Sequence, residues 1–346
     1  MKTTAAVLVE LGRPLEVAEL EIPPLMPGQA LVEIAYSGVC HTQLLEARGL
    51  RGDDRFLPHC LGHEGSGIVR DLGERVRKVK AGDRVILSWI KGSGADVTGT
   101  VYGWQGRRVN AGAITTFSRH AVVSENRLTP VAKDVPLDQA ALLGCAVPTG
   151  MGAVFNKARP RPGQSMAIFG TGGIGLCAVA GAALAGCKPL FAIDIRPEKL
   201  ALAESLGASH PIDASQQDSV AEILRVCPGG VDFAIEATGR PAVMRQALAC
   251  VRNQGGAAIV IGNAPHGQML ELDPRQFNLG KSLLGTWGGD SAPDRDYPQY
   301  ANLLVTGKLC LESLLSRRYG LGGVNRALDD LGRGDVARPL IDMAAE

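Results

Sequence analysis

After residue 147, apolar segments of strand length alternate with alanine-rich segments of helix length, and this alternation constrains the fold more than any other feature. The strand-like segments cover residues 165–169, 190–194, 233–238 and 257–262, and the helix-like segments cover residues 175–185 and 197–206. Strands that alternate with helices predict a parallel sheet with crossover helices. We therefore expect an α/β domain with a doubly wound parallel sheet over residues 147–287.

A glycine-rich loop joins the first of these strands to the next helix. Its sequence, Gly170-Thr171-Gly172-Gly173-Ile174-Gly175, has the spacing G-x-G-x-x-G of a dinucleotide-binding loop. In that fingerprint the first glycine permits a tight turn, the second lets the backbone approach a pyrophosphate, and the last allows close helix packing. The N–H groups that open the helix would face this anion. A glycine turn that binds no nucleotide is the alternative, and the flanking strand and helix argue against it.

The second strand ends in Asp194, nineteen residues after Gly175. The fingerprint expects an acidic residue near this position, where it accepts hydrogen bonds from the adenosine ribose. Because a carboxylate repels a 2′-phosphate, we predict NAD rather than NADP as the cofactor. Arg196, two residues further on, leaves NADP as the alternative.

Before residue 147 the sequence shows short strands broken by glycine and proline, such as residues 30–36, 67–70 and 84–87. This sequence pattern is typical of a β-rich domain. The C-terminal segment, with helical patterns at residues 297–306 and 324–331, is expected to rejoin it. The length of 346 residues also favours two domains. We predict one domain over residues 1–146 and 288–346, and the other over residues 147–287.

The charge balance and the lengths of the apolar runs exclude two classes of partner, and the cysteines indicate the redox state of the thiols. The 36 lysines and arginines nearly balance the 35 acidic residues, and no basic run occurs, so no nucleic-acid partner is expected. No stretch approaches about eighteen uninterrupted apolar residues, and the N-terminal apolar run is too short for a signal peptide. We therefore expect no membrane partner and a cytoplasmic location. Eight cysteines without a C-x-x-C pair indicate thiols rather than disulfides.

Three places in the β-rich part carry thiol or imidazole groups beside glycines: Cys40-His41, His63-Glu64 and Gly144-Cys145. Such ligands suit a divalent zinc ion with an open fourth position. Each place alone also fits a buried cysteine or a hydrogen-bonded histidine. The prediction of a metal site therefore depends on the three occurring together.

Combined with the dinucleotide loop, these segments resemble the zinc-dependent alcohol dehydrogenases of the medium-chain dehydrogenase/reductase family. Order and approximate spacing match over nearly the whole chain, at Cys40-His41-Thr42, Leu61-Gly62-His63-Glu64-Gly65, Gly144-Cys145, Pro148-Thr149-Gly150, the loop 170–175 and Val336-Ala337-Arg338. The resemblance implies a GroES-like catalytic domain and a Rossmann domain that binds NAD. The activity it implies is reversible hydride transfer between NAD and an alcohol, aldehyde or ketone.

The resemblance also implies the roles of single residues. Cys40, His63 and Cys145 are the ligands of a catalytic zinc. Glu64 is a carboxylate that can approach the metal during ligand exchange, and Thr42 relays the proton of the alcohol. Zinc makes this proton easier to lose because the cation stabilises the anionic oxygen.

Other roles concern the cofactor and the substrate. By the same resemblance Thr149 lies beside the nicotinamide, His41 and Arg338 contact the pyrophosphate, and Lys199 lies at the adenosine end. Trp89 would form a wall of the substrate pocket, although an ordinary buried tryptophan is the alternative.

The sequence departs from the family in several places. Most members bind a second, structural zinc through four closely spaced cysteines, but residues 91–110 contain none. We therefore predict one zinc per chain, and a glycine-rich loop at residues 91–110 that is more mobile or reorganised. Gln43 stands where the family usually has an aspartate that orients the histidine ligand. Leu45 cannot extend a proton relay, and Cys60 is interpreted as core packing.

Two other functions are kept as alternatives. One is a zinc-free, NADPH-linked quinone or enone reductase of the same family. The other is an NAD(H)-binding sensor or structural protein without catalysis. The preferred substrate is a small alcohol or aldehyde, with a primary alcohol of apolar or aromatic body favoured. Family analogy predicts a homodimer through the segment near residues 282–287, with a tetramer as the alternative.

Overall fold

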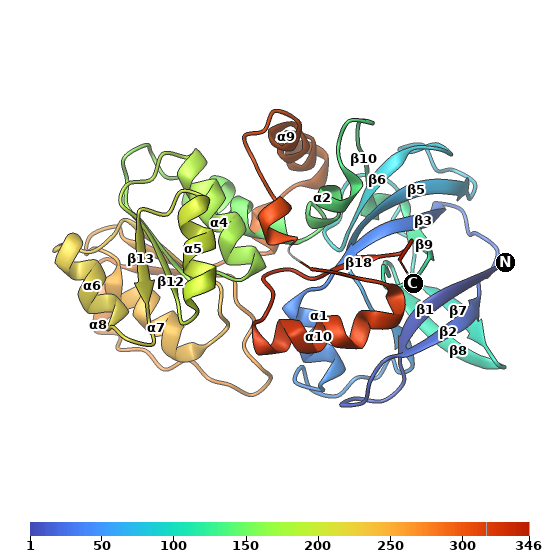
Figure 1. Cartoon of the computed structure of the whole chain (residues 1–346), viewed down its shortest axis with the longest axis horizontal. Helices are drawn as coiled ribbons and strands as arrows, with labels where there is room; N and C mark the ends of the chain where they lie inside the picture. Colours follow the sequence, from blue (N-terminus) through green and yellow to red (C-terminus); the bar gives the residue numbers. More distant parts are fainter. Residues whose placement is uncertain (316, 346) are drawn as a thin grey trace. The chain divides into compact units, whose positions relative to one another are not determined.

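The structure is a computed structural model that describes residues 1–315 and 317–345 (Figure 1). It divides into two compact units. Unit 1 comprises Met1–Cys145 and Ala292–Glu346, and unit 2 comprises Ala146–Ser291. The sequence-based division put Ala146 and residues 288–291 in the first domain, but they fall in unit 2. There the short helix η3 (Gly288–Asp290) packs on α3 (Ala146–Gly152).

Unit 2 is built on a parallel sheet of six strands among its described residues, in the order β13-β12-β11-β14-β15-β16. These strands are β11 (Met166–Phe169), β12 (Leu190–Asp194), β13 (His210–Asp213), β14 (Phe233–Glu236), β15 (Ala257–Val260) and β16 (Ser282–Gly285). Its helices are α3, the π-helix η2 (Ala153–Ala158), α4 (Gly173–Leu184), α5 (Pro197–Ser205), α6 (Ser219–Val226), α7 (Pro241–Cys250) and α8 (Arg275–Asn278). The order reverses beside β11, where doubly wound sheets bind ligands. This confirms the predicted Rossmann fold.

Buried apolar side chains of the strands explain why this sheet forms. Phe169, Phe191, Ile193 and Ala234 are buried in a core shared with the helices α6 and α7. A strand covered on both faces carries a continuous apolar run rather than an alternating one, as Met166–Phe169 does. The helices α4 and α5 cover one side of β11 to β13 (Figure 1).

Unit 1 contains a closed barrel and a second sheet. The barrel runs β1-β2-β7-β8-β4, from β1 (Lys2–Leu8), β2 (Glu16–Glu21), β7 (Thr100–Trp104), β8 (Arg107–Gly112) and β4 (His59–Cys60). The sheet runs β10-β6-β5-β3-β18-β17, with β9 also paired to β3. Its strands are β3 (Gln29–Gly38), β5 (Glu64–Leu72), β6 (Arg84–Ser88), β9 (His120–Ser124), β10 (Leu128–Pro130), β17 (Arg318–Tyr319) and β18 (Leu340–Asp342). The strand β18 shows that the C-terminal segment rejoins this unit.

Four α-helices of the described residues accompany these strands: α1 (His41–Ala47), α2 (Leu137–Leu142), α9 (Pro293–Val305) and α10 (Val324–Arg333). Short 3-10 turns cover Glu125–Arg127, Glu312–Leu314 and Leu321–Gly323. The helices α1 and α10 lie side by side (Figure 1). None of the described helices is long and apolar enough to span a bilayer.

Residues 91–110, expected as a mobile or reorganised loop, are reorganised in the structure. Their second half forms the antiparallel hairpin β7–β8, with Gln105 and Gly106 in its turn at positive φ of 50° and 77°. Such φ values suit the primed turns of tight hairpins. The hairpin pairs with β2 through Glu21 and Gly103, and with β4 through His59 and Asn110. It thereby closes the barrel.

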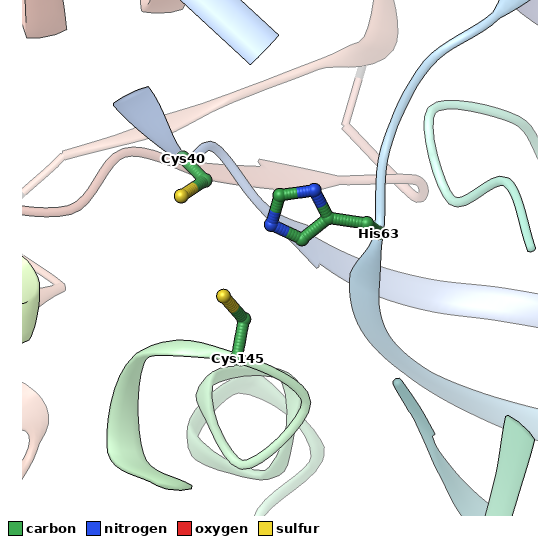
Figure 2. A group of neighbouring side chains, drawn as sticks. All are labelled: Cys40, His63 and Cys145. Carbon is green, nitrogen blue, oxygen red and sulfur yellow. The ribbon is translucent and has the colours of Figure 1, made fainter. Parts of the chain in front are cut away.

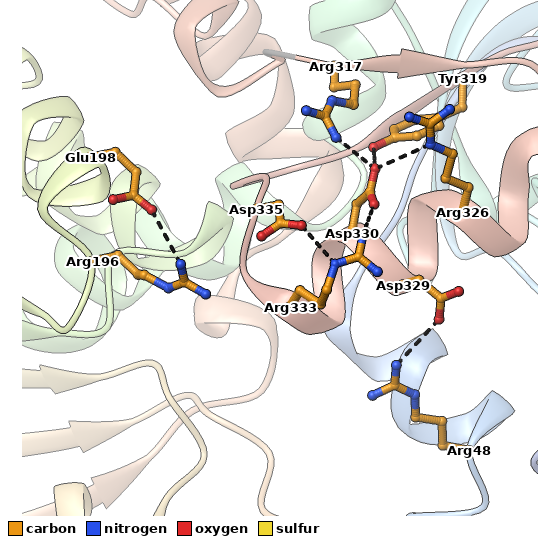
Figure 3. A network of polar contacts seen from close by, with 10 residues as sticks. All are labelled: Arg48, Arg196, Glu198, Arg317, Tyr319, Arg326, Asp329, Asp330, Arg333 and Asp335. Carbon is orange, nitrogen blue, oxygen red and sulfur yellow. Dashed lines mark hydrogen bonds and ion pairs between the residues drawn. The ribbon is translucent and has the colours of Figure 1, made fainter.

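A buried carboxylate fastens α10 to the neighbouring strand β17. Asp330 accepts hydrogen bonds from the hydroxyl of Tyr319 at 2.6 Å and from Arg317 at 2.8 Å, and it also pairs with Arg333 (Figure 3). The Tyr319 hydroxyl is the main reason why the pKa of Asp330 lies below its ordinary value. Arg326 also pairs with it at 3.9 Å, so its anion is stabilised by four groups at once.

Candidate metal centre and nucleotide site

Three side chains from distant parts of unit 1 meet in one small cluster. The sulfur atoms of Cys40 and Cys145 and a ring nitrogen of His63 all lie within 4.8 Å of one another (Figure 2). Both cysteines are buried, and His63 is half-buried. These are the residues that the resemblance proposed as zinc ligands, and the fold brings all three together.

Turns at the ends of secondary-structure elements position these ligands. Cys40 follows the end of β3 and is the N-terminal cap of α1. His63 directly precedes β5 and follows Gly62, whose φ is +97°. A Cβ atom on Gly62 would lie 2.6 Å from the backbone nitrogen of Phe117, so no larger residue fits. Cys145 follows the turn after α2.

The buried carboxylate of Glu64 fits between two glycines. A Cβ atom on Gly38 would lie 2.0 Å from Oε1 of Glu64, and one on Gly144 would lie 2.9 Å from its Cβ. Glu64 forms an ion pair with Arg338, which is also buried. The two glycines therefore make room for a charged pair that burial alone would disfavour.

Gln43 connects two of the three ligands. It is fully buried in the first turn of α1, and its Oε1 accepts the backbone N–H of Cys40 at 2.6 Å. Its Nε2 lies 2.7 Å from Nδ1 of His63. The opposite ring nitrogen, Nε2 of His63, is buried and has no hydrogen-bond partner.

The donor set fits a zinc ion. An unpartnered imidazole nitrogen faces two thiols, which is the chemistry of a three-residue zinc site with an open position. A hydrogen bond from Cys145 is the main cause that holds the pKa of Cys40 well below its ordinary value. The pKa of Cys145 is raised in turn by its contact with Cys40 and by burial. A divalent cation allows both sulfurs to be anionic, since metal binding releases their protons.

The remaining predicted residues of unit 1 lie around this cluster. The hydroxyl of Thr42 is 3.8 Å from the sulfur of Cys40, and His41 is exposed at the start of α1. Trp89 donates its backbone N–H to the carbonyl of His63, and the two rings meet edge-on with centroids 6.4 Å apart. Leu45 is buried, and Cys60 lies in the barrel core, where burial raises its pKa to about 12.

A cavity of about 480 Å³ on the side of the barrel borders His63 of the cluster. His63 and Gln43 line it, together with Glu46 and the aromatic ring of Phe56. Small residues form much of the remaining wall: Gly62, Gly99, Ala111, Gly112 and Ala113. Gly99 directly precedes β7, and Ala111 and Gly112 end β8. Burial raises the pKa of Glu46.

In unit 2 the loop 170–175 joins β11 to α4, as predicted. Gly170 has a φ of +89°, and a Cβ atom on Gly175 would lie 1.8 Å from the carbonyl oxygen of Gly170. A Cβ atom on Gly172 would meet nothing within 4 Å. Because this open space lies at the N-terminal cap of α4, an anion can approach the backbone there. Gly173 and Ile174 form the first turn of the same helix.

Asp194 ends β12 and is already engaged with the loop. Its Oδ2 accepts the backbone N–H and the hydroxyl of Thr171, at 2.7 and 3.0 Å. Its Oδ1 accepts the backbone N–H groups of Ile195 and Arg196. Arg196 forms an ion pair with Glu198 (Figure 3), and Lys199 is half-buried in α5. Thr149, in α3, is buried with an unpartnered hydroxyl.

Glu236 supports this loop and was not found from the sequence. At the end of β14 it accepts hydrogen bonds from the backbone N–H groups of Thr238 and Gly239. Thr238 lies directly under Gly170, where a glycine Cβ would be 2.6 Å from its Cγ2. Burial raises the pKa of Glu236. Only its position at the end of an apolar strand could have signalled this role.

Comparisons with known proteins show the family to which the chain belongs. Residues 26–133 match the family described as "Alcohol dehydrogenase GroES-like domain", and residues 173–306 match "Zinc-binding dehydrogenase". An S-(hydroxymethyl)glutathione dehydrogenase of Synechocystis is 34% identical over 370 residues, covering 99% of this chain and 100% of that protein. The chain belongs to the zinc-dependent alcohol dehydrogenases of the medium-chain dehydrogenase/reductase family. The predicted family, fold and class of enzyme are confirmed.

Other members of the family are similar over the full length. An alcohol dehydrogenase class-3 of Cereibacter sphaeroides is 30% identical, with 99% of this chain and all of that protein covered. The crystal structure of benzyl alcohol dehydrogenase from Acinetobacter calcoaceticus has a TM-score of 0.91 at 31% identity, covering 99% of this chain and 100% of that chain. A zinc-binding-domain alcohol dehydrogenase from Burkholderia ambifaria has a TM-score of 0.92 at 32% identity, with 99% of each chain covered.

Proposed function

We propose that this alcohol dehydrogenase uses one zinc per chain, held by Cys40, His63 and Cys145, and NAD as the hydride acceptor. The unpartnered Nε2 of His63 between two thiols is the observation that carries the zinc assignment. NAD is supported by the open approach to Gly172 and by the carboxylate of Asp194 at the end of β12. A single zinc is supported by the absence of cysteine from residues 91–110.

When bound, zinc supplies a Lewis acid that lowers the pKa of the alcohol oxygen. The chain's own residues receive and hold the charges. The hydroxyl of Thr42, 3.8 Å from the sulfur of Cys40, takes the proton of the alcohol in this proposal. Arg338 neutralises Glu64, so that this buried carboxylate is kept close to the ligands without an uncompensated charge.

We propose an alcohol with a bulky apolar or aromatic body as the substrate. The cavity beside His63, about 480 Å³, is large enough for such a group, since ligand pockets begin near 300 Å³. Among the described residues that line it, none is a lysine or an arginine, and Glu46 adds a carboxylate. Two of the relatives are named for S-(hydroxymethyl)glutathione and for benzyl alcohol. A wall with this charge disfavours the anionic glutathione adduct and favours the neutral aromatic alcohol.

A substrate panel tests these assignments. The purified enzyme, with its zinc content measured on the same sample, is assayed with benzyl alcohol, ethanol and S-(hydroxymethyl)glutathione, each with NAD and with NADP. We expect one zinc per chain and the highest kcat/KM for benzyl alcohol with NAD. Ala113→Leu, which places a larger side chain at the half-buried wall, should lower kcat/KM for benzyl alcohol by about tenfold, and leave ethanol within about twofold.

Other outcomes of the panel identify the alternatives. Turnover of a quinone or enone with NADPH and no stoichiometric zinc would indicate the reductase function. Binding of NADH without turnover of any alcohol or aldehyde would indicate a sensor. A preference for S-(hydroxymethyl)glutathione would refute the charge argument based on Glu46.

We further propose a cytoplasmic homodimer that pairs through the edge strand β16. This strand ends the sheet of unit 2, and the nearby Trp287 is 75% exposed. Light scattering of the purified chain distinguishes the dimer from the tetramer and the monomer. If Trp287→Ser leaves the mass unchanged, this tryptophan is not essential to the contact.

A further inference from the structure

Gln43 makes two hydrogen-bonding contacts that together define the orientation of its amide. The backbone N–H of Cys40 can only donate, so the atom of Gln43 that lies 2.6 Å from it must be the oxygen Oε1. The amide nitrogen therefore faces Nδ1 of His63 at 2.7 Å. The Gln43 side chain itself is fully buried.

This orientation determines which ring nitrogen of His63 carries the proton. An amide NH₂ group is a donor only, so Nδ1 must accept, and the neutral ring then has its proton on Nε2. Nε2 is the nitrogen that faces the two cysteine sulfurs. A metal needs an unprotonated nitrogen. The ring is therefore held in the tautomer that cannot bind the metal through this atom.

Binding a metal at Nε2 moves the ring proton to Nδ1, where it meets the donor of Gln43. Turning the amide over brings Oε1 to Nδ1, but it then brings the NH₂ group against the N–H of Cys40. In either orientation one pair of donors is left facing each other in a buried place. A carboxylate of the same length has two acceptors and would satisfy both N–H groups at once.

We propose that Gln43 is a positioning residue that holds His63 in the tautomer with its proton on Nε2, and thereby weakens zinc capture by this site. The proposal rests on the zinc assignment made above, but it also makes a claim about the metal-free protein. Outer hydrogen-bond partners of a metal-bound histidine commonly change metal affinity about 10- to 100-fold. The same range is expected here when the amide is replaced by a carboxylate.

Gln43→Glu tests the proposal through zinc affinity. Metal-free full-length wild type and variant compete for zinc with a chromophoric chelator of known affinity. We expect the zinc Kd of Gln43→Glu to be about 10- to 100-fold lower than that of wild type. An equal or higher Kd overturns the proposal.

Glu46→Gln serves as the matched charge control. Glu46 lies on the same short helix, lines the same cavity and carries a half-buried carboxylate. If affinity follows local negative charge alone, this variant should weaken zinc binding by a factor similar to the gain in Gln43→Glu. If hydrogen-bond matching decides, Glu46→Gln should change the Kd by less than about threefold, and a larger change counts against the proposal.

The tautomer of His63 is measured independently of zinc. Ring nitrogen and carbon chemical shifts of the metal-free protein are recorded at pH 8.5, with His63→Ala assigning the signal. We expect the proton on Nε2 in wild type and on Nδ1 in Gln43→Glu. A proton on Nδ1 in wild type overturns the proposal even if the variant does not fold. If neither protein binds zinc, the zinc assignment fails, while the tautomer result still decides the role of Gln43.

Discussion

Gly172 and Gly175 belong to the same loop, but the structure gives them different tasks, and this difference leads to our principal prediction. A Cβ atom on Gly172 meets no atom within 4 Å, whereas one on Gly175 would lie 1.8 Å from the carbonyl oxygen of Gly170. Gly172 also has an extended backbone, with φ −73° and ψ −174°, which alanine adopts without strain. Gly172→Ala should therefore fold, whereas Gly175→Ala should be strongly destabilised.

Gly172→Ala should weaken cofactor binding. The methyl group fills the space through which a pyrophosphate approaches the N-terminus of α4, so one or two hydrogen bonds from backbone N–H groups to the anion are lost. Each such bond to a charged group contributes about 1.5–3 kcal/mol. Losing one of them raises the Kd of NADH by roughly 10- to 150-fold. Replacing glycine by alanine at a helix cap should lower the free energy of unfolding by no more than about 1 kcal/mol.

NADH fluorescence titration and thermal unfolding measure the two quantities on the same sample. Gly229→Ala is the matched control, because Gly229 lies in the same unit, its φ is not positive, and its Cβ would also meet nothing within 4 Å. The control should leave both NADH affinity and stability unchanged. If Gly172→Ala binds NADH as tightly as the control does, the loop is not the pyrophosphate site and the reasoning is refuted.

Three further predictions concern the metal, the ribose contact and acid stability. His63→Ala should lose its bound zinc and at least about a thousandfold of alcohol turnover, as measured by metal analysis and NADH formation; retained turnover without zinc would contradict the zinc assignment. Thr171→Val removes one of the two donors to Oδ2 of Asp194. Because this donor competes with the ribose, NADH binding should tighten by roughly three- to tenfold. Weaker NADH binding would mean that the hydroxyl orients the carboxylate. The pKa of Asp330 is lowered in the folded state, so its contribution to stability is present at neutral pH and is lost as the pH falls below about 4. Asp330→Asn should lower the free energy of unfolding at pH 7 by about 1–3 kcal/mol and flatten this acid dependence, and an unchanged acid profile would show that Tyr319 does not stabilise the anion.

The fold and the cluster of candidate metal ligands could be predicted because their signals are local or depend on spacing. The run Met166–Phe169, the glycine loop and Asp194 occur in one stretch of sequence, and each has one dominant physical interpretation. Cys40, His63 and Cys145 were recognised through the family pattern, not through periodicity. Their meeting within 4.8 Å depends on three separate turns, and local sequence does not encode this distance.

The hairpin β7–β8 was missed although a signal was present. Thr100–Trp104 alternates in burial and contains β-branched and aromatic residues, and Gln105 with Gly106 supplies the turn. The absence of cysteines and the many glycines drew attention to a loop instead. Pairing with Glu21 and His59, both distant in sequence, decides the structure here.

Glu236 and Gln43 illustrate what sequence patterns cannot contain. Glu236 ends an apolar strand, but this position alone does not show that its carboxylate accepts the backbone N–H of Thr238 beneath Gly170. The departure at Gln43 was visible, but its consequence depends on the orientation of one amide. That orientation follows from two distances, 2.6 Å to Cys40 and 2.7 Å to His63, which only coordinates provide.

Gln43 and Thr171 are expected to affect ligand binding in the same way, each at its own proposed site. Each occupies hydrogen-bonding capacity on a residue that is proposed to bind a ligand, His63 for zinc and Asp194 for the ribose. Binding at either place therefore exchanges one hydrogen bond for another interaction instead of adding one, and only the difference contributes to affinity. Removing a competing donor should consequently tighten binding, whereas removing a supporting group should weaken it. The sign of the change in Kd distinguishes these two roles at both sites.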